Sequence, residues 1–337
     1  MITISPVKEP EYQKIWQEKN KHVLQSLAWG NVKESEGWQI LRAGIFQDDL
    51  LVDVLCLQIK NIGVIKFGYL PKINDIKHWS LLSEFCKQEL HLDFVIVEFD
   101  IQRDAGLQLP PNFVPYQDHI QPPQTNLVNL HKTEEQLFAC LKGNYRRNIK
   151  KAQKDNIICK FYLQGEDIAV DKLYFVLQHI FANTKFLPRT KKYFNKIWQE
   201  LSATKEIVIG TAEMGQELLG AFLIVTDNKG AYELYGGVTK NGRNLEAGYL
   251  LKWEAIKYFN AQDKDFYDHW GVSKMTEDGT YEHDELFNIS SFKEGFGGIY
   301  HEFYPTQVLL LAPQKYKIFK LLKAGSNIWT KLIKSLK

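Results

Sequence analysis

The chain has 337 residues, which exceeds the size at which a single hydrophobic core usually stops growing, so two domains are expected. Hydrophobic residues make up 45% and aromatic residues 13% of the sequence, a composition that excludes long disordered regions. The formal net charge is only +2, from 42 basic and 40 acidic residues, and this balance alone indicates no polyanionic partner.

The basic charge is concentrated at the end of the chain. Residues 314–337 hold seven lysines and no acid, so the rest carries 35 basic against 40 acidic residues, a formal charge of −5. The four cysteines, at positions 56, 86, 140 and 159, lack metal-site spacing and are interpreted as buried thiols. Because neither a signal-peptide core nor a run of about 18 apolar residues occurs, we expect a cytoplasmic protein.

The first half alternates strands and helices. The expected elements are a short first strand, a helix at 9–20, strands at 38–45, 50–59 and 63–67, a helix at 73–90 and a strand at 94–99. Five prolines between Arg103 and Gln124 preclude regular structure there. We therefore expect a first domain at 1–124.

The second half has the same mixture, which favours two α/β or α+β units of one architecture, although no residue-level repeat is visible. Thr133 is expected to cap a helical region that reaches 154. The later elements are a strand at 157–163, helices at 166–183 and 190–201, strands at 206–213, 217–226 and 230–236, a helix at 244–259 and a strand at 265–268. We expect a second domain at 125–312, whose end can pack back on the first, and basic amphipathic helices at 313–337.

Cations gather on adjoining faces of the helix expected at 144–154. Arg146, Lys150 and Lys154 form a basic row, which Arg147 and Lys151 adjoin. Such a row can neutralise the phosphates of a nucleic acid, by backbone contacts and single-stranded ends, because no groove-reading motif is present. A solvated helix face is the alternative.

Lys293 lies between two aromatic residues and three glycines, in the stretch from Ser291 to Gly298. Phe292 and Phe296 are expected to pack together around the lysine stem, while the glycines let a backbone or a ligand approach closely. This pattern is typical of a cation held near a substrate for charge stabilisation. The alternative is a surface lysine beside a turn.

Two further segments suggest anion recognition. Arg189 and Tyr193 stand one helical turn apart and suit a phosphate, although a structural arginine that caps the preceding helix is equally ordinary. The glycine-bearing loop before the helix at 244–259 resembles the pyrophosphate loop of acetyl-coenzyme A dependent acyltransferases, but Glu246 occupies the middle glycine position and disfavours coenzyme A. Hydrolase, P-loop and dinucleotide motifs are absent, which leaves a transferase or a binding protein.

Several pieces, in order and at characteristic spacing, resemble the Fem family of peptidoglycan interpeptide-bridge aminoacyltransferases over residues 22–311. The pieces are Gln25-x3-Trp29-x3-Lys33, Arg146-Arg147-Asn148-Ile149-Lys150-Lys151-Ala152, Arg189-x3-Tyr193, Tyr235-Gly236-Gly237, Tyr267-Asp268-x-Trp270-Gly271 and Phe292-Lys293-x-Gly295-Phe296-Gly297-Gly298. The short span from Lys191 to Glu206 matches the compact type, which lacks a coiled-coil arm.

The resemblance implies two acetyltransferase-like (GNAT-like) domains of mixed sheet flanked by helices. It also implies transfer of an amino acid from aminoacyl-tRNA, bound by the basic helix, to the stem peptide of a UDP-linked or lipid-linked peptidoglycan precursor, by a monomer without metal or coenzyme. Lys293 matches the catalytic lysine. The matched residues for substrate binding are Lys33, Trp29, Arg189, Tyr193, Tyr235, Trp270 and Gly271, of which Lys33, Arg189 and Tyr193 match the positions for the diphosphate.

In such a reaction, Lys293 stabilises the negative oxygen that forms when the acceptor amine attacks the ester. Asp100 and Asp268 are candidate bases for the amine protons, and a turn-forming or structural role is the alternative for both. The basic tail at 314–337 suits an anionic membrane at the inner face of the cell membrane, or else it packs on the globular body. Two rival functions remain: an acyl-coenzyme A dependent N-acyltransferase, and a noncatalytic protein that binds tRNA or a cell-wall precursor.

Overall fold

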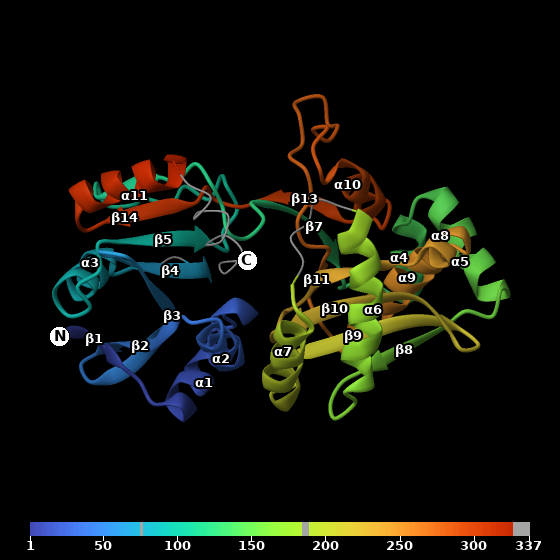
Figure 1. The fold of residues 1–337 in the computed structure, drawn as a ribbon, viewed down its shortest axis with the longest axis horizontal. Helices are drawn as coiled ribbons and strands as arrows, with labels where there is room; N and C mark the ends of the chain where they lie inside the picture. The colour runs from blue at the N-terminus through green and yellow to red at the C-terminus, as the bar shows by residue number, and fades with distance from the viewer. Residues whose placement is uncertain (75–76, 184–188, 326–337) are drawn as a thin grey trace. The chain divides into compact units, whose positions relative to one another are not determined.

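A computed structural model describes residues 1–74, 77–183 and 189–325 and divides the chain into two units (Figure 1). Unit 2 holds residues 124–301, and unit 1 holds residues 1–123 together with the chain from Glu302 onward. The chain therefore returns to unit 1 before residue 312, where the sequence analysis ended the second domain. The reason is that a strand at 307–310 belongs to the sheet of unit 1.

Unit 1 is a mixed sheet covered by helices on both faces. Its strands are β1 (Ile2–Pro6), β2 (Gln39–Gln47), β3 (Leu50–Ile62), β4 (Ile65–Ile73), β5 (Phe94–Phe99), β6 (Phe113–Pro115) and β14 (Gln307–Leu310). Its helices are α1 (Glu9–Glu18), a short 3-10 helix (Val23–Gln25), α2 (Leu27–Ser35), α3 (Trp79–Gln88) and α11 (Pro313–Gly325). The strand order is β1-β2-β3-β4-β5-β14-β6.

Strand β5 explains why unit 1 needs helices on both faces. Its residues 94–99 are all buried, with alternate side chains turned to opposite faces. Val95 and Val97 pack in a cluster that contains Trp79 of α3, whereas Phe94 and Ile96 pack in a cluster that contains Phe319 of α11. A strand covered on both faces needs hydrophobic residues on both, so this run lacks alternation; only Glu98 interrupts it, and its carboxylate accepts from the Tyr69 hydroxyl and the Ile120 amide.

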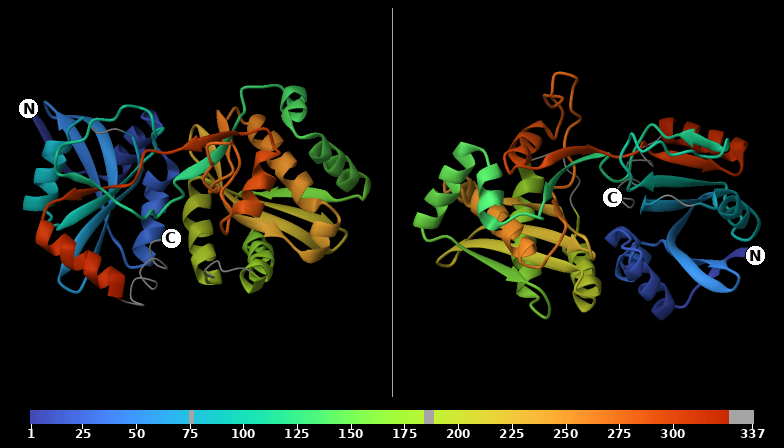
Figure 2. Two further views of the ribbon diagram at one scale, coloured as in Figure 1. Left: turned by 90° about the horizontal axis from the view of Figure 1, so that it is seen from above. Right: turned by 180° about the vertical axis from the view of Figure 1, so that it is seen from behind.

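Unit 2 repeats the architecture. Its strands are β7 (Gln124–Asn129), β8 (Ile158–Tyr162), β9 (Ile207–Met214), β10 (Glu217–Thr226), β11 (Gly230–Val238), β12 (Phe266–Asp268) and β13 (Ile299–Glu302). Its helices are α4 (Glu134–Cys140), α5 (Gly143–Lys154), α6 (Ile168–Asn183), α7 (Lys191–Ala203), α8 (Lys240–Asn244), α9 (Ala247–Asn260) and α10 (Phe287–Glu294). Helices α6 and α7 cover one face of the sheet, and α9, flanked by α5, covers the other (Figure 2).

The two sheets have the same plan. Unit 2 has the order β8-β9-β10-β11-β12-β7-β13, and in each sheet the fourth and fifth strands are the parallel pair, β4 with β5 and β11 with β12. The sixth strand of each sheet comes from a distant part of the chain. Strand β7 follows β6 of unit 1 but joins the sheet of unit 2, and β14 follows β13 but joins the sheet of unit 1. The units thus exchange one strand each, as a duplicated domain with swapped strands would.

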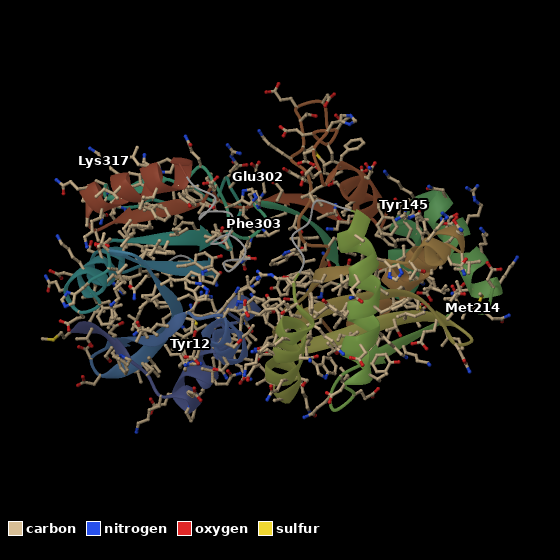
Figure 3. All side chains as sticks on the ribbon, viewed as in Figure 1. Tyr12, Tyr145, Met214, Glu302, Phe303 and Lys317 are labelled. Carbon is tan, nitrogen blue, oxygen red and sulfur yellow. The ribbon has the colours of Figure 1, made fainter. Side chains whose placement is uncertain are left out.

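The return into unit 1 is fixed by local contacts. The Phe303 amide donates to the Pro123 carbonyl at 2.9 Å, and the Arg103 amide donates to the Glu302 carbonyl at 2.9 Å (Figure 3). Within unit 1, β14 then pairs antiparallel with both β5 and β6, with Val308 opposite Ile96 and Val114. Because Val308 and Leu309 are fully buried, β14 is an interior strand of this core.

Most predicted elements are present, and the exceptions have local causes. The helix expected at 73–90 begins only at Trp79, since β4 extends to Ile73. The helical region after Thr133 breaks at Leu141, whose backbone is extended, into α4 and α5. The proline-rich linker, where no regular structure was expected, contains the three-residue strand β6. Thr133 caps α4 in a capping box with Gln136, and the sequence predicts this cap.

The cysteines are partly as expected. Cys56 and Cys86 are buried thiols, but Cys140, at the end of α4, is exposed, so the interpretation is wrong for it. Among the described residues, no helix is both long and apolar enough to cross a membrane. The described residues also contain no group of three or more potential metal-binding side chains.

Candidate active site

The parallel strands β11 and β12 separate after a short paired stretch, and a cluster of polar residues lies beyond that point. Pairing ends at Tyr232 opposite Asp268, whereas β11 continues to Val238. A bulge in β11 also interrupts its register with β10 between Glu233 and Tyr235. Such a bulge re-aims a side chain, and here Glu233 contacts residues of both α9 and β12.

Lys293 belongs to the last turn of α10, and its ammonium is buried in unit 2. Its Nζ donates to the carbonyl oxygen of Gly271 at 2.7 Å and to that of Trp270 at 3.4 Å. A lysine has three donors, so one N–H of Lys293 has no partner among the described residues. The residue as a whole is 9% exposed.

Asp268 holds the turn that presents these carbonyls. Its Oδ1 accepts from the Trp270 amide at 2.6 Å and from the Thr125 hydroxyl of β7. Trp270 has a positive φ of 62°, a left-handed conformation that costs energy in a bulky residue unless other contacts fix it. The Asp268 carboxylate is therefore engaged as a turn-forming group, which is the alternative that the sequence left open for it.

A second buried lysine, Lys252 of α9, lies in the same cluster and was missed by the sequence analysis. Its Nζ donates to both Glu233 oxygens, at 2.8 and 2.7 Å, and lies 3.3 Å from His269 Nδ1. Tyr267 donates its hydroxyl to the same Glu233 carboxylate at 2.5 Å. Lys252 sits between Leu251 and Trp253 in a helix that is buried on most sides, and that position is the signal that could have found it.

Burial, and after it the positive charge of Lys252, lower the pKa of Lys293 from 10.5 to about 7. Glu233 and Asp268 act in the opposite direction but do not offset these effects. Burial, with the charges of Lys252 and Lys293, also lowers the pKa of His269 well below its usual value, so this imidazole is neutral. At neutral pH the cluster thus holds a lysine poised between its charged and neutral forms.

The aromatic pair predicted beside Lys293 is present. The rings of Phe292 and Phe296 meet edge to face at 5.2 Å, but the cation they flank is Lys252, at 5.6 and 5.8 Å from their centroids. The neighbouring glycines serve packing within the protein. A Cβ at Gly295 would lie 2.0 Å from a ring carbon of Tyr145, and one at Gly298 would lie 1.8 Å from the Asn126 side-chain oxygen.

Arg189, Tyr193 and Tyr235 come together in unit 2. The Arg189 guanidinium lies 4.6 Å from the ring centroid of Tyr193, whose ring lies 6.5 Å from that of Tyr235. Thr190 caps α7 by accepting from the Tyr193 amide at 3.2 Å, which fixes the start of the helix beside Arg189. The preceding segment 184–188, between the helices expected at 166–183 and 190–201, lies outside the described residues.

The other residues predicted to bind the acceptor substrate, and the candidate base Asp100, lie in unit 1. Ser26 caps α2 through the Trp29 amide, and this helix carries Trp29 and Lys33, whose Nζ is 5.3 Å from the Trp29 ring centroid. Lys33 is 1% exposed. Asp100 follows β5, and its amide donates to the Ile73 carbonyl at 2.8 Å. These residues therefore belong to a different unit from Lys293.

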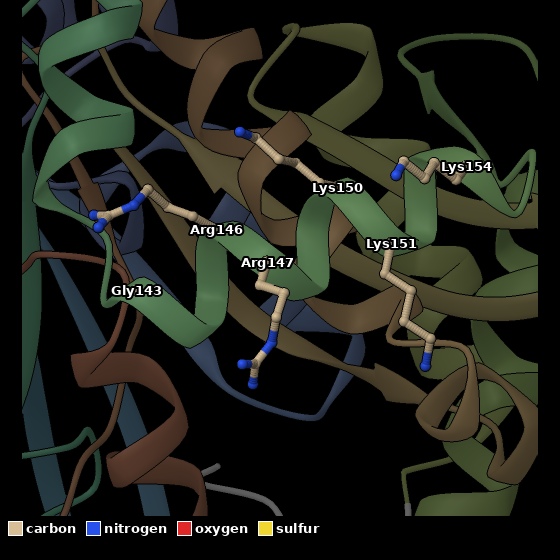
Figure 4. A pocket seen from close by; sticks show the side chains of 6 residues that line it. All are labelled: Gly143, Arg146, Arg147, Lys150, Lys151 and Lys154. Atoms are coloured by element: carbon tan, nitrogen blue, oxygen red, sulfur yellow. The ribbon is translucent and has the colours of Figure 1, made fainter.

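The five predicted cations form a row on α5 (Figure 4). Together with Gly143 they line an open hollow of about 500 Å³. Arg146 is partly structural, because its Nη1 donates to the carbonyls of Ala139 and Leu141 at the end of α4. Lys151 lies 3.9 Å from Glu246, and Lys150 lies over the Phe138 ring at 5.8 Å.

The loop before α9 does not fit a pyrophosphate. Glu246 is the N-cap of α9 and has a left-handed backbone with φ 59°, a conformation that glycine adopts most easily. Its carboxylate makes no hydrogen bond to the helix N-terminus and lies 3.9 Å from Lys151. A negative charge at this position disfavours a second anion such as the diphosphate of coenzyme A.

Helix α11 presents two different faces. Tyr316 and Phe319 are buried against β4 and β5 in the core of unit 1. Ile318, Leu321 and Leu322 are exposed, by 45%, 73% and 51%. One face of 313–325 therefore packs on the globular body, which was the alternative to membrane binding. The rest of the tail, 326–337, lies outside the described residues.

Comparison with known proteins completes the description of the fold. Residues 141–274 match the family described as acetyltransferase (GNAT) domain. The crystal structure of FemX superposes with a TM-score of 0.80 over 94% of this chain and 99% of that chain, at 14% sequence identity. The chain has the fold of FemX. The predicted fold class, two GNAT-like domains, is confirmed, and so, at the level of the fold, is the resemblance to the Fem family.

Two other solved structures are similar. One is the C-terminal domain of a putative lysylphosphatidylglycerol synthetase from Agrobacterium fabrum, with a TM-score of 0.55, 12% identity and coverage of 95% of this chain and 99% of that chain. The other is a tandem GNAT protein from the clavulanic acid biosynthesis pathway, with a TM-score of 0.52, 9% identity and coverage of 92% and 98%. No curated protein matches the sequence. The GNAT domain and the FemX fold together support an acyltransferase.

Proposed function

We propose that this protein transfers an amino acid from aminoacyl-tRNA to the stem-peptide amine of a peptidoglycan precursor. The observation that carries the proposal is Lys293, a buried ammonium with two donors fixed on backbone carbonyls and a third left over. The sequence resemblance to the Fem family and the fold shared with FemX support the choice of substrates. The Glu246 carboxylate in the loop before α9 argues against an acyl-coenzyme A donor.

The chemistry requires no group beyond those of the cluster and the two substrates. The acceptor amine attacks the ester carbonyl of the aminoacyl-tRNA, which forms a C–N bond and a negative tetrahedral oxygen. The C–O bond to the ribose then breaks, the amine loses a proton and the ribose oxygen gains one. Lys293 would donate its remaining N–H to the tetrahedral oxygen, where a preorganised donor is worth about 3 kcal/mol.

Each unit contains candidate residues for acceptor binding. In unit 2, we assign Arg189 and Tyr193 at the start of α7 to the diphosphate, because a guanidinium can neutralise it. In unit 1, the resemblance assigns Lys33 of α2 to the diphosphate and Trp29 of the same helix to substrate binding. Tyr235 would line the wall next to Tyr193, and Trp270 and Gly271 would lie beside the reacting centre through their contacts with Lys293. Asp100 stays a candidate base from unit 1.

The test is a transfer reaction analysed by mass spectrometry. The protein is incubated with a mixed aminoacyl-tRNA pool and with both the UDP-linked and the lipid-linked precursor. We expect one precursor to gain the mass of one amino acid, and fragmentation to place it on the stem peptide. If neither precursor gains mass while the protein still binds tRNA, the rival noncatalytic binding function is correct.

We propose that the cations of α5 hold the tRNA. The variant with Arg147→Ala, Lys150→Ala and Lys154→Ala removes three exposed cations but keeps Arg146, which ties α5 to α4. We expect its tRNA affinity to fall roughly tenfold at low salt, and the slope of log K against log salt to decrease by about 2, because fewer counterions are released. Filter binding at several salt concentrations measures both.

The control for this experiment is the variant Lys14→Ala with Lys19→Ala, which removes one cation from α1 in unit 1 and one from its C-cap. It changes the net charge in the same direction at another surface. Equal losses of affinity in both variants would contradict the assignment of the α5 row to tRNA.

We also propose that α11 binds an anionic membrane surface, where a lipid-linked acceptor would reside. Its exposed Ile318, Leu321 and Leu322 alternate with lysines, and residues 314–337 contain no acid. We expect the wild-type protein to sediment with vesicles rich in phosphatidylglycerol but not with neutral vesicles. The variant with serine at these three positions should stay in the supernatant while keeping Tyr316 and Phe319, which pack in the core. Equal pelleting of both proteins would refute membrane binding.

A further inference from the structure

We propose that Lys252 is a positioning residue for Lys293: its ammonium, held in the buried cluster by Glu233 and His269, controls the protonation of the lysine beside the reacting carbonyl. This inference rests on the proposed role of Lys293 beside the reacting carbonyl. It adds a function for a pair of residues, Lys252 and Glu233, that the resemblance does not assign.

Lys252 is held without freedom to move. Its three donors have three acceptors: the two oxygens of Glu233 at 2.8 and 2.7 Å and His269 Nδ1 at 3.3 Å. His269 Nδ1 must accept from the ammonium, which places the imidazole proton on Nε2. Lys252 is 1% exposed, and its partner Glu233 is further fixed by the Tyr267 hydroxyl. Burial lowers the pKa of Lys252, but the Glu233 carboxylate acts in the opposite direction, and its two hydrogen bonds favour the charged form of Lys252 at a fixed position.

The groups that face Lys293 come from three directions. Lys252 belongs to α9, Glu233 to β11 and Asp268 to the end of β12, and the charges of all three act on Lys293. His269 lies 3.3 Å from Lys252 Nζ and directly precedes Trp270, whose carbonyl accepts from Lys293. Both carboxylates are already engaged, Glu233 by Lys252 and Asp268 by the Trp270 amide, whereas Lys293 binds only neutral carbonyls. A second ammonium in a buried site is disfavoured by the first, which is a known way to activate a lysine.

A lysine poised in this way can carry the proton of the transfer reaction. Neutral Lys293 accepts a proton from the attacking acceptor amine as the C–N bond forms. The resulting ammonium faces the tetrahedral oxygen and then returns the proton to the ribose oxygen as the C–O bond breaks. Atoms and charges balance without another reactant, and the positive charge appears when the negative oxygen does.

The experiment measures the protonation of Lys293 directly. The protein is labelled with lysine carrying ¹³C at Cε, the Lys293 signal is assigned by its loss in Lys293→Met, and its shift is followed with pH. We expect the wild-type signal to titrate near neutral pH. In Lys252→Met its midpoint should rise by about one pH unit or more, and the ascending limb of the kcat profile should move by a similar amount.

Two further variants complete the design. Lys257 lies on the same helix α9, and its ammonium is paired with Glu254. The variant Lys257→Met should therefore leave the titration midpoint of Lys293 unchanged. If Lys252→Met leaves Glu233 unpaired and fails to fold, the double variant Lys252→Met with Glu233→Gln removes both charges. Its midpoint should rise by less, because the effect of Lys252 on Lys293 exceeds the opposite effect of Glu233. A Lys293 signal that titrates in Lys252→Met, or in the double variant if the single one does not fold, at the same pH as in the wild type overturns the inference. Because the titration needs no substrate, it stands apart from the proposed function, which fails by absence of transfer.

Discussion

Replacing Lys293 by methionine should lower the rate of transfer about a hundredfold or more while leaving the protein folded. Methionine has a similar length and fits the site between α10 and the 270–271 turn, but it removes the donor that faces the reacting carbonyl. Loss of one such donor costs about 3 kcal/mol of transition-state stabilisation. The rate constant under saturating substrates, measured by quantitative mass spectrometry, gives this value.

Lys142→Met is the matched control. Lys142 lies near Lys293 in the structure through its ion pair with Glu294 at 2.9 Å, but its side chain is half exposed. A surface ion pair contributes about 1 kcal/mol or less, so this variant should keep its rate. If Lys293→Met and Lys142→Met transfer amino acid equally well, Lys293 is not the catalytic lysine.

Lys293→Met should also stabilise the protein at pH 6. The pKa of Lys293 is lowered from 10.5 to about 7 in the folded protein, so between these values the unfolded chain binds more protons. The free energy of unfolding of the wild type therefore rises as pH increases from 7 to 10. Below pH 7, Lys293 is charged in the folded protein, and the cost of burying this charge lowers the free energy of unfolding by its full amount. Loss of two carbonyl contacts offsets part of the gain, so we expect a net gain of about 1–2 kcal/mol. Urea unfolding at pH 6 and pH 9 should show this difference disappear at the higher pH.

The exchange of strands between the units leads to the second large effect. Residues 1–123 expressed alone should not fold, because the sheet of unit 1 then lacks β14 between β5 and β6. The missing strand carries the fully buried Val308 and Leu309, and α11 adds Tyr316 and Phe319 to the same core. Each such side chain contributes about 1.5–3 kcal/mol, which together is comparable to the whole stability of a domain.

A designed single-chain unit 1 provides the comparison. Joining Pro123 to Glu302 by a short glycine-serine linker restores β14 and α11, and the Phe303 amide already lies 2.9 Å from the Pro123 carbonyl. We expect a cooperative unfolding transition for this chain and none for residues 1–123, by circular dichroism and urea titration. A stable, cooperative fold of residues 1–123 alone would contradict the strand exchange.

Local sequence signals predict the type of most strands and helices, but α2, α10, β13 and β14 were not predicted. The run at 94–99, which is hydrophobic except for Glu98, is β5 with the same bounds. Thr133 and Gln136 form the capping box because every group involved lies within four residues. The exchange of β7 and β14 cannot be predicted in this way, since hydrophobic periodicity indicates a strand but not the sheet in which it pairs.

The site was predictable only where short motifs carry it. Lys293 stands out through its aromatic and glycine neighbours, and Arg189 and Tyr193 through their spacing on one helix. Lys252 was missed because its partner Glu233 lies 19 residues away, and only the bulge in β11 brings the two together. The glycines after Lys293 were assigned partly to ligand approach, whereas Gly295 and Gly298 accommodate Tyr145 and Asn126.

The most direct test of the account is the choice of donor. The wild-type protein is given an acceptor precursor with either a mixed aminoacyl-tRNA pool or acetyl-coenzyme A, and the mass of the precursor is followed over time. The account predicts an aminoacylated precursor from aminoacyl-tRNA, lost in Lys293→Met, and no acetylated precursor. An acetylated precursor formed from acetyl-coenzyme A at a comparable rate, without reaction of aminoacyl-tRNA, would contradict it.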